Sequence, residues 1–175
     1  ELSKRWSVLG SFGKYYQFAN RVTREDILSG SKDFWLLSDD ESVPVSSSLH
    51  YIGGFSYNLP KYVFSVEGYY KNVYDITEYS LRFNPSPNGI SYDENFFSGK
   101  GYAKGIEFLA QKKGGKLNGW ISYTLAEAKN NFEIYSNEYY SANQDVTHEF
   151  KIVSMFNHKR WDFSATWVYA TGRPY

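Results

Sequence analysis

A short tract recurs four times along this sequence, and it always stands at a tight turn. Each copy joins a basic residue to a large apolar or aromatic residue and leads into a run of alternating side chains. The copies are Ser3–Val8, Leu59–Phe64, Gly114–Gly119 and His158–Phe163. The connections between these turns are long, polar and rich in tyrosine. Tight turns at one edge of an antiparallel sheet and long connections at the other are typical of a transmembrane β-barrel.

The alternating runs predict seven strands. They cover residues 5–17, 47–58, 61–78, 99–113, 116–129, 146–157 and 160–171. These runs are about 12 residues or longer, whereas strands of globular proteins usually have ~5–6. Tilted strands need ~9–11 residues to cross a hydrocarbon layer. Since no segment shows a helical period, we expect an all-β chain.

Each predicted strand has one apolar and one polar face. In residues 61–78, Tyr62, Phe64 and Val66 share the first face, while Glu67 and Lys71 fall on the second. Charged residues are expected only on the second face, as the water-filled interior of a barrel requires. Glu67, Glu107, Glu149 and Asp162 share it with Lys71 and Lys151, and we expect cross-strand ion pairs among them.

Aromatic residues mark two levels of the predicted sheet. The chain has 17 Tyr, 13 Phe and 5 Trp among its 175 residues. One group lies beside the tight turns: Trp6, Tyr57, Tyr62, Phe156 and Trp161. A second group lies toward the long connections: Tyr16, Tyr51, Tyr70, Trp167 and Tyr169. Two aromatic belts are what two membrane–water interfaces favour.

Charge and cysteine content limit the classes of function. Lys and Arg total 19 and Asp and Glu total 19, so the formal net charge is zero. A nucleic-acid-binding domain usually carries a basic face, so no nucleic-acid partner is expected. The absence of cysteine excludes a disulfide framework and a thiolate metal site. No apolar stretch approaches the ~20 residues of a membrane helix.

The motifs that suggest catalysis or cofactor binding have simpler interpretations. The glycine-rich segment 99–105 lacks nucleotide-binding spacing, and its glycines are expected to relax a strand in a curved wall. His50 and His148 are expected at hydrogen-bonded wall positions, and His158 in a turn. The acidic run 39–41 lacks the spacing of a calcium loop. We therefore expect no metal, no cofactor and no enzymatic activity.

Ligand contacts are expected only in the long connections, residues 18–46, 79–98 and 130–145. Four aromatic residues there are candidates for stacking on a small molecule or glycan: Trp35, Tyr135, Tyr139 and Tyr140. Packing within the loops explains the same residues equally well.

Several segments resemble strands of one known family. Residues 97–108, 119–125, 145–150 and 163–172 resemble, in order, consecutive strands of Bacteroidetes-type TonB-dependent outer-membrane receptors. Residues 13–18 are similar to an earlier strand of that barrel. The likeness extends over nearly the whole chain.

The resemblance implies an active importer in the outer membrane of a Gram-negative bacterium. Such a receptor has a 22-stranded barrel filled by a plug domain and a segment that engages TonB. Its turns at the periplasmic side are tight and its extracellular loops are long. Plug and TonB segment have no counterpart here, so residues 1–175 are expected to form part of the C-terminal half of a barrel. Outer-membrane lipid, the plug domain, TonB and a small-molecule or glycan ligand are the partners implied.

Seven is an odd number of strands, so this chain is not expected to close a barrel alone. Two alternatives stay open. One is a small complete outer-membrane barrel with an adhesive or structural role, which requires an eighth strand. The other is a soluble β-sandwich that binds glycan through surface aromatics. The imported cargo also stays open among siderophore, haem, cobalamin or another vitamin, oligosaccharide and peptide.

Overall fold

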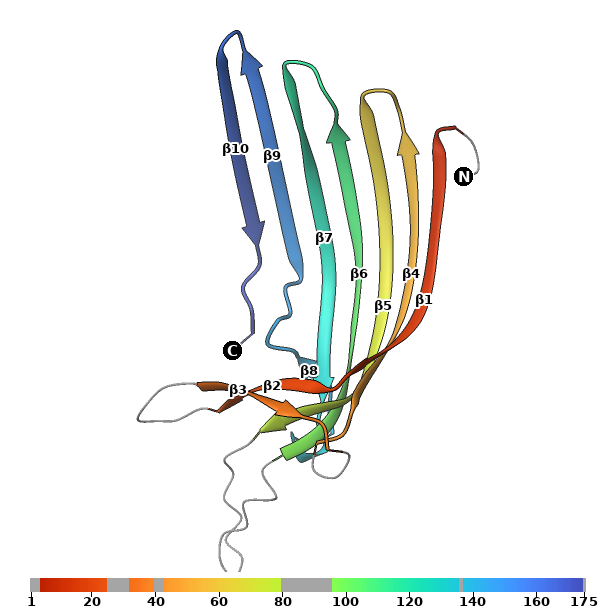
Figure 1. The fold of residues 1–175 in the computed structure, drawn as a ribbon, viewed down its shortest axis with the longest axis vertical. Helices are drawn as coiled ribbons and strands as arrows, with labels where there is room; N and C mark the ends of the chain where they lie inside the picture. The colour runs from red at the N-terminus through yellow and green to blue at the C-terminus, as the bar shows by residue number, and fades with distance from the viewer. Residues whose placement is uncertain (1–3, 25–31, 40–42, 80–95, 136, 175) are drawn as a thin grey trace, which may run out of the picture.

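The computed structural model describes residues 4–24, 32–39, 43–79, 96–135 and 137–174, and these form an all-β structure. Seven long strands lie side by side in one antiparallel sheet (Figure 1). They are β1 (Trp6–Gln17), β4 (Ser46–Asn58), β5 (Tyr62–Tyr79), β6 (Phe96–Lys112), β7 (Leu117–Asn131), β9 (His148–His158) and β10 (Trp161–Ala170). The prediction of long antiparallel strands is confirmed.

The long strands follow one another in the sheet in chain order. Tight turns join β4 to β5, β6 to β7 and β9 to β10 at one end of the strands. We call this end of the sheet the tight-turn edge. The long connections lie at the opposite end of the strands, which we call the loop edge (Figure 1). β1 and β10 are the outermost strands and do not pair with each other, so the sheet is open.

The loop edge contains short elements that the sequence pattern did not predict. β2 (Ala19–Arg24) and β3 (Lys32–Leu37) form a separate two-stranded hairpin, which crosses below the long strands in Figure 1. The connection after β7 contains a 3-10 turn, η2 (Glu133–Tyr135), and β8 (Tyr140–Ser141), which pairs with β7. At most six residues long, these elements give too little alternation for a sequence pattern to resolve.

Residues with positive φ explain one turn and one irregularity of the sheet. Gly114 and Gly115 have φ values of 67° and 83° in the β6–β7 turn, a conformation that glycine adopts without steric cost. Asp75 has a φ of 59° at a β-bulge in β5, where the register against β6 shifts between Tyr74 and Ile76. A bulge adds one residue and bends the strand locally.

The described residues contain a very small hydrophobic core. Its buried apolar side chains are Val22, Val43, Phe132 and Ala142, and all four lie at the loop edge. The long strands add none of their apolar residues to it. The sheet therefore forms a single layer over most of its length. No helix in the described ranges is long and apolar enough to cross a membrane.

Candidate functional site

One face of the sheet, here called the apolar face, carries rows of apolar residues that oppose one another across all seven long strands. The first row is Trp6, Tyr57, Phe64, Ala110, Ile121, Ile152 and Trp167. The next is Val8, Phe55, Val66, Phe108, Tyr123, Phe150 and Tyr169. Because side chains alternate along a strand, every member of a row lies on the same face.

No second layer of the described structure covers the apolar face. Trp6, Phe64 and Phe163 are 38%, 45% and 58% exposed. Monomeric soluble proteins rarely expose apolar patches larger than a few hundred Å², and larger ones mark contact with another protein or a membrane. The apolar face is thus the main candidate for an interaction surface.

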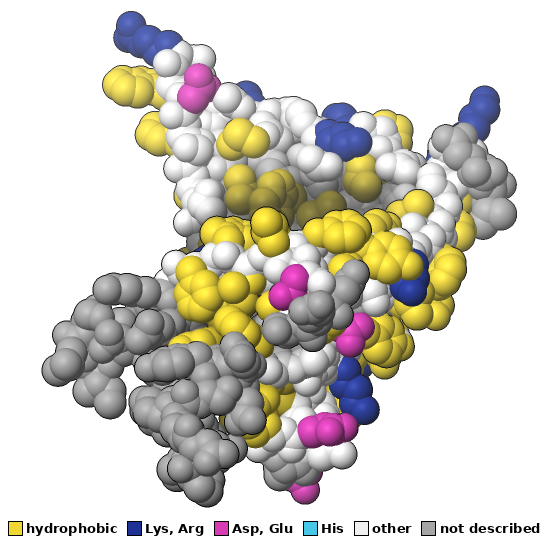
Figure 2. Space-filling view, turned by 60° about the horizontal axis from the view of Figure 1, so that its bottom comes forward, with side chains coloured by type: hydrophobic (Ala, Val, Ile, Leu, Met, Phe, Trp, Pro, Cys, Tyr) yellow, Lys and Arg dark blue, Asp and Glu magenta, His cyan; other side chains and the backbone are white. Residues whose placement is uncertain are grey.

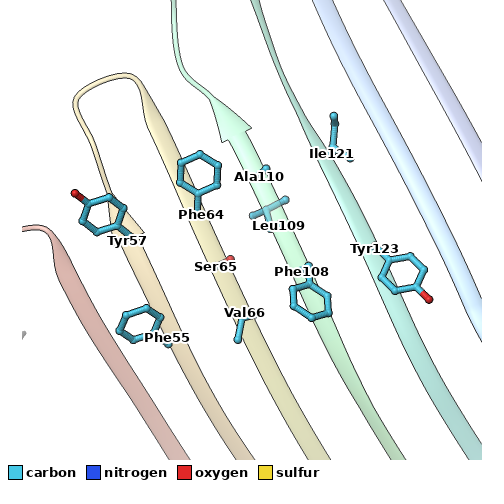
Figure 3. Close-up of a pocket in the computed structure, with 10 residues that line it drawn as sticks. All are labelled: Phe55, Tyr57, Phe64, Ser65, Val66, Phe108, Leu109, Ala110, Ile121 and Tyr123. Atoms are coloured by element: carbon cyan, nitrogen blue, oxygen red, sulfur yellow. The ribbon is translucent and has the colours of Figure 1, made fainter.

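A shallow hollow on the apolar face is lined by residues of four neighbouring strands (Figure 3). Phe55 comes from β4, Phe64 from β5, Phe108 from β6 and Ile121 from β7. Ala110 stands between Phe64 and Ile121 in their row, and its small side chain leaves the space open. The residues that line this hollow carry no charge.

The opposite face, here called the polar face, carries charged and hydroxyl side chains. Ser56, Ser65 and Ser122 lie on it beside the first apolar row, and Glu67, Glu107, Thr124 and Glu149 lie on it one step further along. Lys71 opposes His50 across β4 and β5. The separation of apolar from charged residues in the middle of the sheet agrees with the sequence pattern.

The prediction of cross-strand ion pairs on the polar face is wrong. The register places Glu67 directly opposite Glu107, so like charges meet there. Lys151 pairs instead with Glu149 on its own strand, at 2.6 Å. The carboxylate of Asp162 accepts a hydrogen bond from the Asn157 side chain at 2.6 Å. Pairing across strands depends on register, which the sequence of a single strand does not determine.

The apolar face also carries charges at its loop end, contrary to expectation. Glu127 opposes Lys104, and its carboxylate lies 3.5 Å from the Lys104 ammonium and 3.6 Å from that of Lys129. Tyr102 donates a hydrogen bond to the same carboxylate and stacks on Tyr70 with ring centroids 6.2 Å apart. This polar cluster marks the limit of the uninterrupted apolar rows.

Two of the three histidines, His50 and His148, occupy hydrogen-bonded positions, as expected. His50 Nε2 is 3.0 Å from the Ser48 hydroxyl, and His148 Nδ1 is 2.8 Å from the Tyr123 hydroxyl. His158 ends β9 and stacks on Phe156 instead of lying wholly in the turn. The described ranges contain no group of three His, Cys, Asp or Glu placed to hold a metal ion. Of the acidic run, Asp39 accepts a hydrogen bond from the Val43 backbone, while residues 40–41 lie outside the described residues.

The candidate ligand residues separate into three places. Tyr135 and Tyr140 pack around the fully buried Phe132, with ring centroids 6.1 and 6.5 Å from it. Tyr139 packs on Tyr102 at 5.3 Å, next to the polar cluster. Trp35 lies on β3 and is 69% exposed. The structure therefore brings together only Tyr135 and Tyr140, and only Trp35 and the 48% exposed Tyr139 present much surface.

The aromatic cluster around Phe132 also contains a carboxylate. Glu78 lies near the end of β5, eight residues past Tyr70, and it shares a hydrogen bond with Tyr140. Burial raises the pKa of Glu78, and the hydrogen bond from Tyr140 opposes that rise. Burial and then the Glu78 charge raise the pKa of Tyr140 to about 12. Both residues are half-buried at the loop edge.

The glycine-rich segment has a role that the sequence did not reveal. A Cβ atom on Gly99 would lie 2.5 Å from the Phe132 ring, and one on Gly105 would lie 2.7 Å from the Tyr69 ring. Phe132 and Tyr69 thus fill the space that side chains on these two residues would occupy. The sequence interpretation, strand relaxation in a curved wall, identified the segment as structural but missed these packing partners.

Comparison with known proteins adds no family assignment. No protein-family model matches the chain, and no curated protein matches it either.

Proposed function

We propose that this sheet is a section of the wall of a transmembrane β-barrel, with its apolar face toward lipid. The observation that carries the proposal is the uncovered apolar face, whose rows continue across all seven long strands. A face of this kind needs an apolar medium or partner. The opposed polar face suits a water-filled interior, because residues of a barrel strand alternate between lipid and lumen.

The dimensions of the apolar face support a membrane crossing. On β7 its apolar members extend from Leu117 to Leu125, a span of nine residues. A tilted strand crosses the hydrocarbon layer with ~9–11 residues. On β5 the apolar members begin at Tyr62 and end at Tyr70, so a tyrosine stands at each end, where interfacial aromatics are expected.

We further propose that the barrel is a TonB-dependent outer-membrane receptor that imports a bulky, scarce nutrient such as a siderophore, haem, vitamin or glycan. The support is the chain-order arrangement of the strands, with tight turns at one edge and long connections at the other, together with the segments that resemble this family. The role is transport and not catalysis. Plug and TonB contacts belong to other parts of such a receptor, and Trp35 and Tyr139 are the exposed candidates for contact with cargo.

A pair of arginine substitutions on β7 tests the orientation of the two faces. Ile121 lies on the apolar face at the middle of the Leu117–Leu125 span, so Ile121→Arg places a charge in the hydrocarbon. We expect a loss of about 2–4 kcal/mol in the free energy of unfolding from lipid bilayers. Urea titration of the chain folded into vesicles measures the change.

Thr124→Arg on the same strand is the matched control. Thr124 lies on the polar face directly between Glu107 and Glu149, so an arginine there meets two carboxylates. We expect this variant to unfold at a urea concentration close to that of the unmodified chain. A silent Ile121→Arg together with a destabilising Thr124→Arg contradicts the proposed orientation and favours a soluble sheet.

A further inference from the structure

The tight-turn edge of the sheet carries a concentration of positive charge. Eight of the 19 Lys and Arg residues lie at or next to this edge. They form what we call the basic rim: Lys4, Arg5, Lys61, Lys112, Lys113, Lys116, Lys159 and Arg160. Figure 2 shows Lys and Arg side chains (dark blue) that project at the upper left and upper right of the view.

Backbone hydrogen bonds align the basic rim across the sheet. The carbonyl of Arg5 accepts a hydrogen bond from the Asn58 amide at 2.7 Å, and that of Lys116 accepts one from the Asn157 amide at 2.7 Å. The carbonyl of Lys61 accepts one from the Lys113 amide at 2.8 Å. The cations therefore stand at the ends of paired strands, on one edge of the same sheet.

Few acidic residues of the described structure lie near the lysines of the basic rim. Asp162 is the only described acid at the tight-turn edge, and Asn157 occupies its carboxylate. Lys61 directly precedes β5 and Lys113 directly follows β6, so these exposed cations are neighbours, and like charges placed opposite each other are destabilising. The lysines of the basic rim take part in none of the four ion pairs of the described ranges.

The next residue after several of these cations belongs to the apolar face. Tyr62 follows Lys61, Leu117 follows Lys116 and Trp161 follows Arg160. A cationic residue next to a large apolar residue is suited to a membrane–water interface, where one side chain meets water and the other meets hydrocarbon. In this arrangement the cation stands at headgroup depth when its neighbour is in the hydrocarbon.

We propose that the basic rim binds the anionic headgroups of phospholipids in the leaflet that the tight turns face. This inference depends on the membrane orientation proposed above and adds a specific partner to it. Cations beside a membrane span attract anionic lipid over a distance of about one Debye length. The rim thereby also fixes the depth of the sheet in the bilayer.

Vesicle binding with two matched variants tests the proposal. The rim variant K61Q/K116Q removes two exposed cations, and the control K14Q/K100Q removes two exposed cations at the loop end. Each chain is added to phosphatidylcholine vesicles with and without phosphatidylglycerol at low salt, and flotation measures the bound fraction. We expect the rim variant to bind the anionic vesicles about thirtyfold more weakly, on the order of fivefold for each cation. The control is expected to bind like the unmodified chain.

The outcomes separate this inference from the proposed function. Equal weakening of both variants, or of neither, overturns the role of the basic rim. Failure of the unmodified chain to bind vesicles of either composition contradicts the membrane orientation itself. Circular dichroism in neutral detergent micelles is expected to show the same strand content for all three chains, which excludes misfolding as the cause of a lost affinity.

Discussion

Gly99 shows how the absence of a side chain determines the packing at the loop edge. Gly99 lies on β6 against the ring of Phe132, which has no exposed surface. Since the small core of the described residues lies at this edge, the ring has little freedom to move away. The same principle applies at Gly105, where the Tyr69 ring lies over the backbone of the neighbouring strand. A missing side chain here makes room for an aromatic one.

Gly99→Ala is expected to destabilise the chain because the new methyl group overlaps Phe132. The cost of such overpacking is about 1–3 kcal/mol in the free energy of unfolding. Gly53→Ala is the control, since a Cβ atom there has no neighbour within 4 Å. The control is expected to be neutral or to stabilise by up to about 1 kcal/mol. Urea unfolding in detergent micelles measures both, and equal effects contradict the packing role of Gly99.

At the scale of the strands, the sequence predicted the long elements well. The expected 47–58 and 160–171 compare with Ser46–Asn58 and Trp161–Ala170 in the structure. Long alternation and tight turns carry this information locally. The β2–β3 hairpin was missed because its two strands are only six residues long, and the ion pairing of Glu67 was wrong because register depends on the neighbouring strand.

The bulge in β5 is a second element-scale feature that the pattern did not predict. Asp75 adopts a left-handed conformation there, and its carbonyl accepts a hydrogen bond from the Ser46 hydroxyl at 2.6 Å. Aspartate tolerates this conformation better than most residues, so its presence is compatible with the bulge. The bulge ties the end of β5 to the start of β4, where the loop edge begins.

Replacing Asp75 with glycine or with valine isolates the backbone requirement, since both changes remove the carboxylate. In a regular strand valine is the more favourable residue. At a positive φ of 59° we expect the reverse, with Asp75→Gly more stable than Asp75→Val by about 1–2 kcal/mol. Paired urea titrations give the difference. A more stable valine variant shows that β5 does not need the left-handed residue.

At the scale of the whole molecule, the described residues enclose very little apolar interior. Folding must offset a conformational entropy cost of ~1–2 kcal/mol for each residue, mainly through apolar burial. The described residues bury only four apolar side chains, whereas the long strands leave most of theirs exposed. In the membrane proposed above, lipid provides the apolar contact that the described residues do not make with one another. Alternation in the sequence predicted which residues share the apolar face, and the register confirms this grouping. The packing of Tyr135, Tyr139 and Tyr140 was not predictable, because loop packing has no sequence period.

Tryptophan fluorescence distinguishes lipid from other coverings of the apolar face. Trp167 lies on the apolar face opposite Ile152, while Trp120 lies on the polar face opposite Gln111 and Val153. In single-tryptophan variants with the remaining tryptophans changed to phenylalanine, brominated acyl chains quench only a ring that contacts hydrocarbon. We therefore expect strong quenching of Trp167 and weak quenching of Trp120 in the same vesicles. Comparable quenching of both means that the sheet does not separate lipid from water, and stronger quenching of Trp120 means that its two faces are inverted.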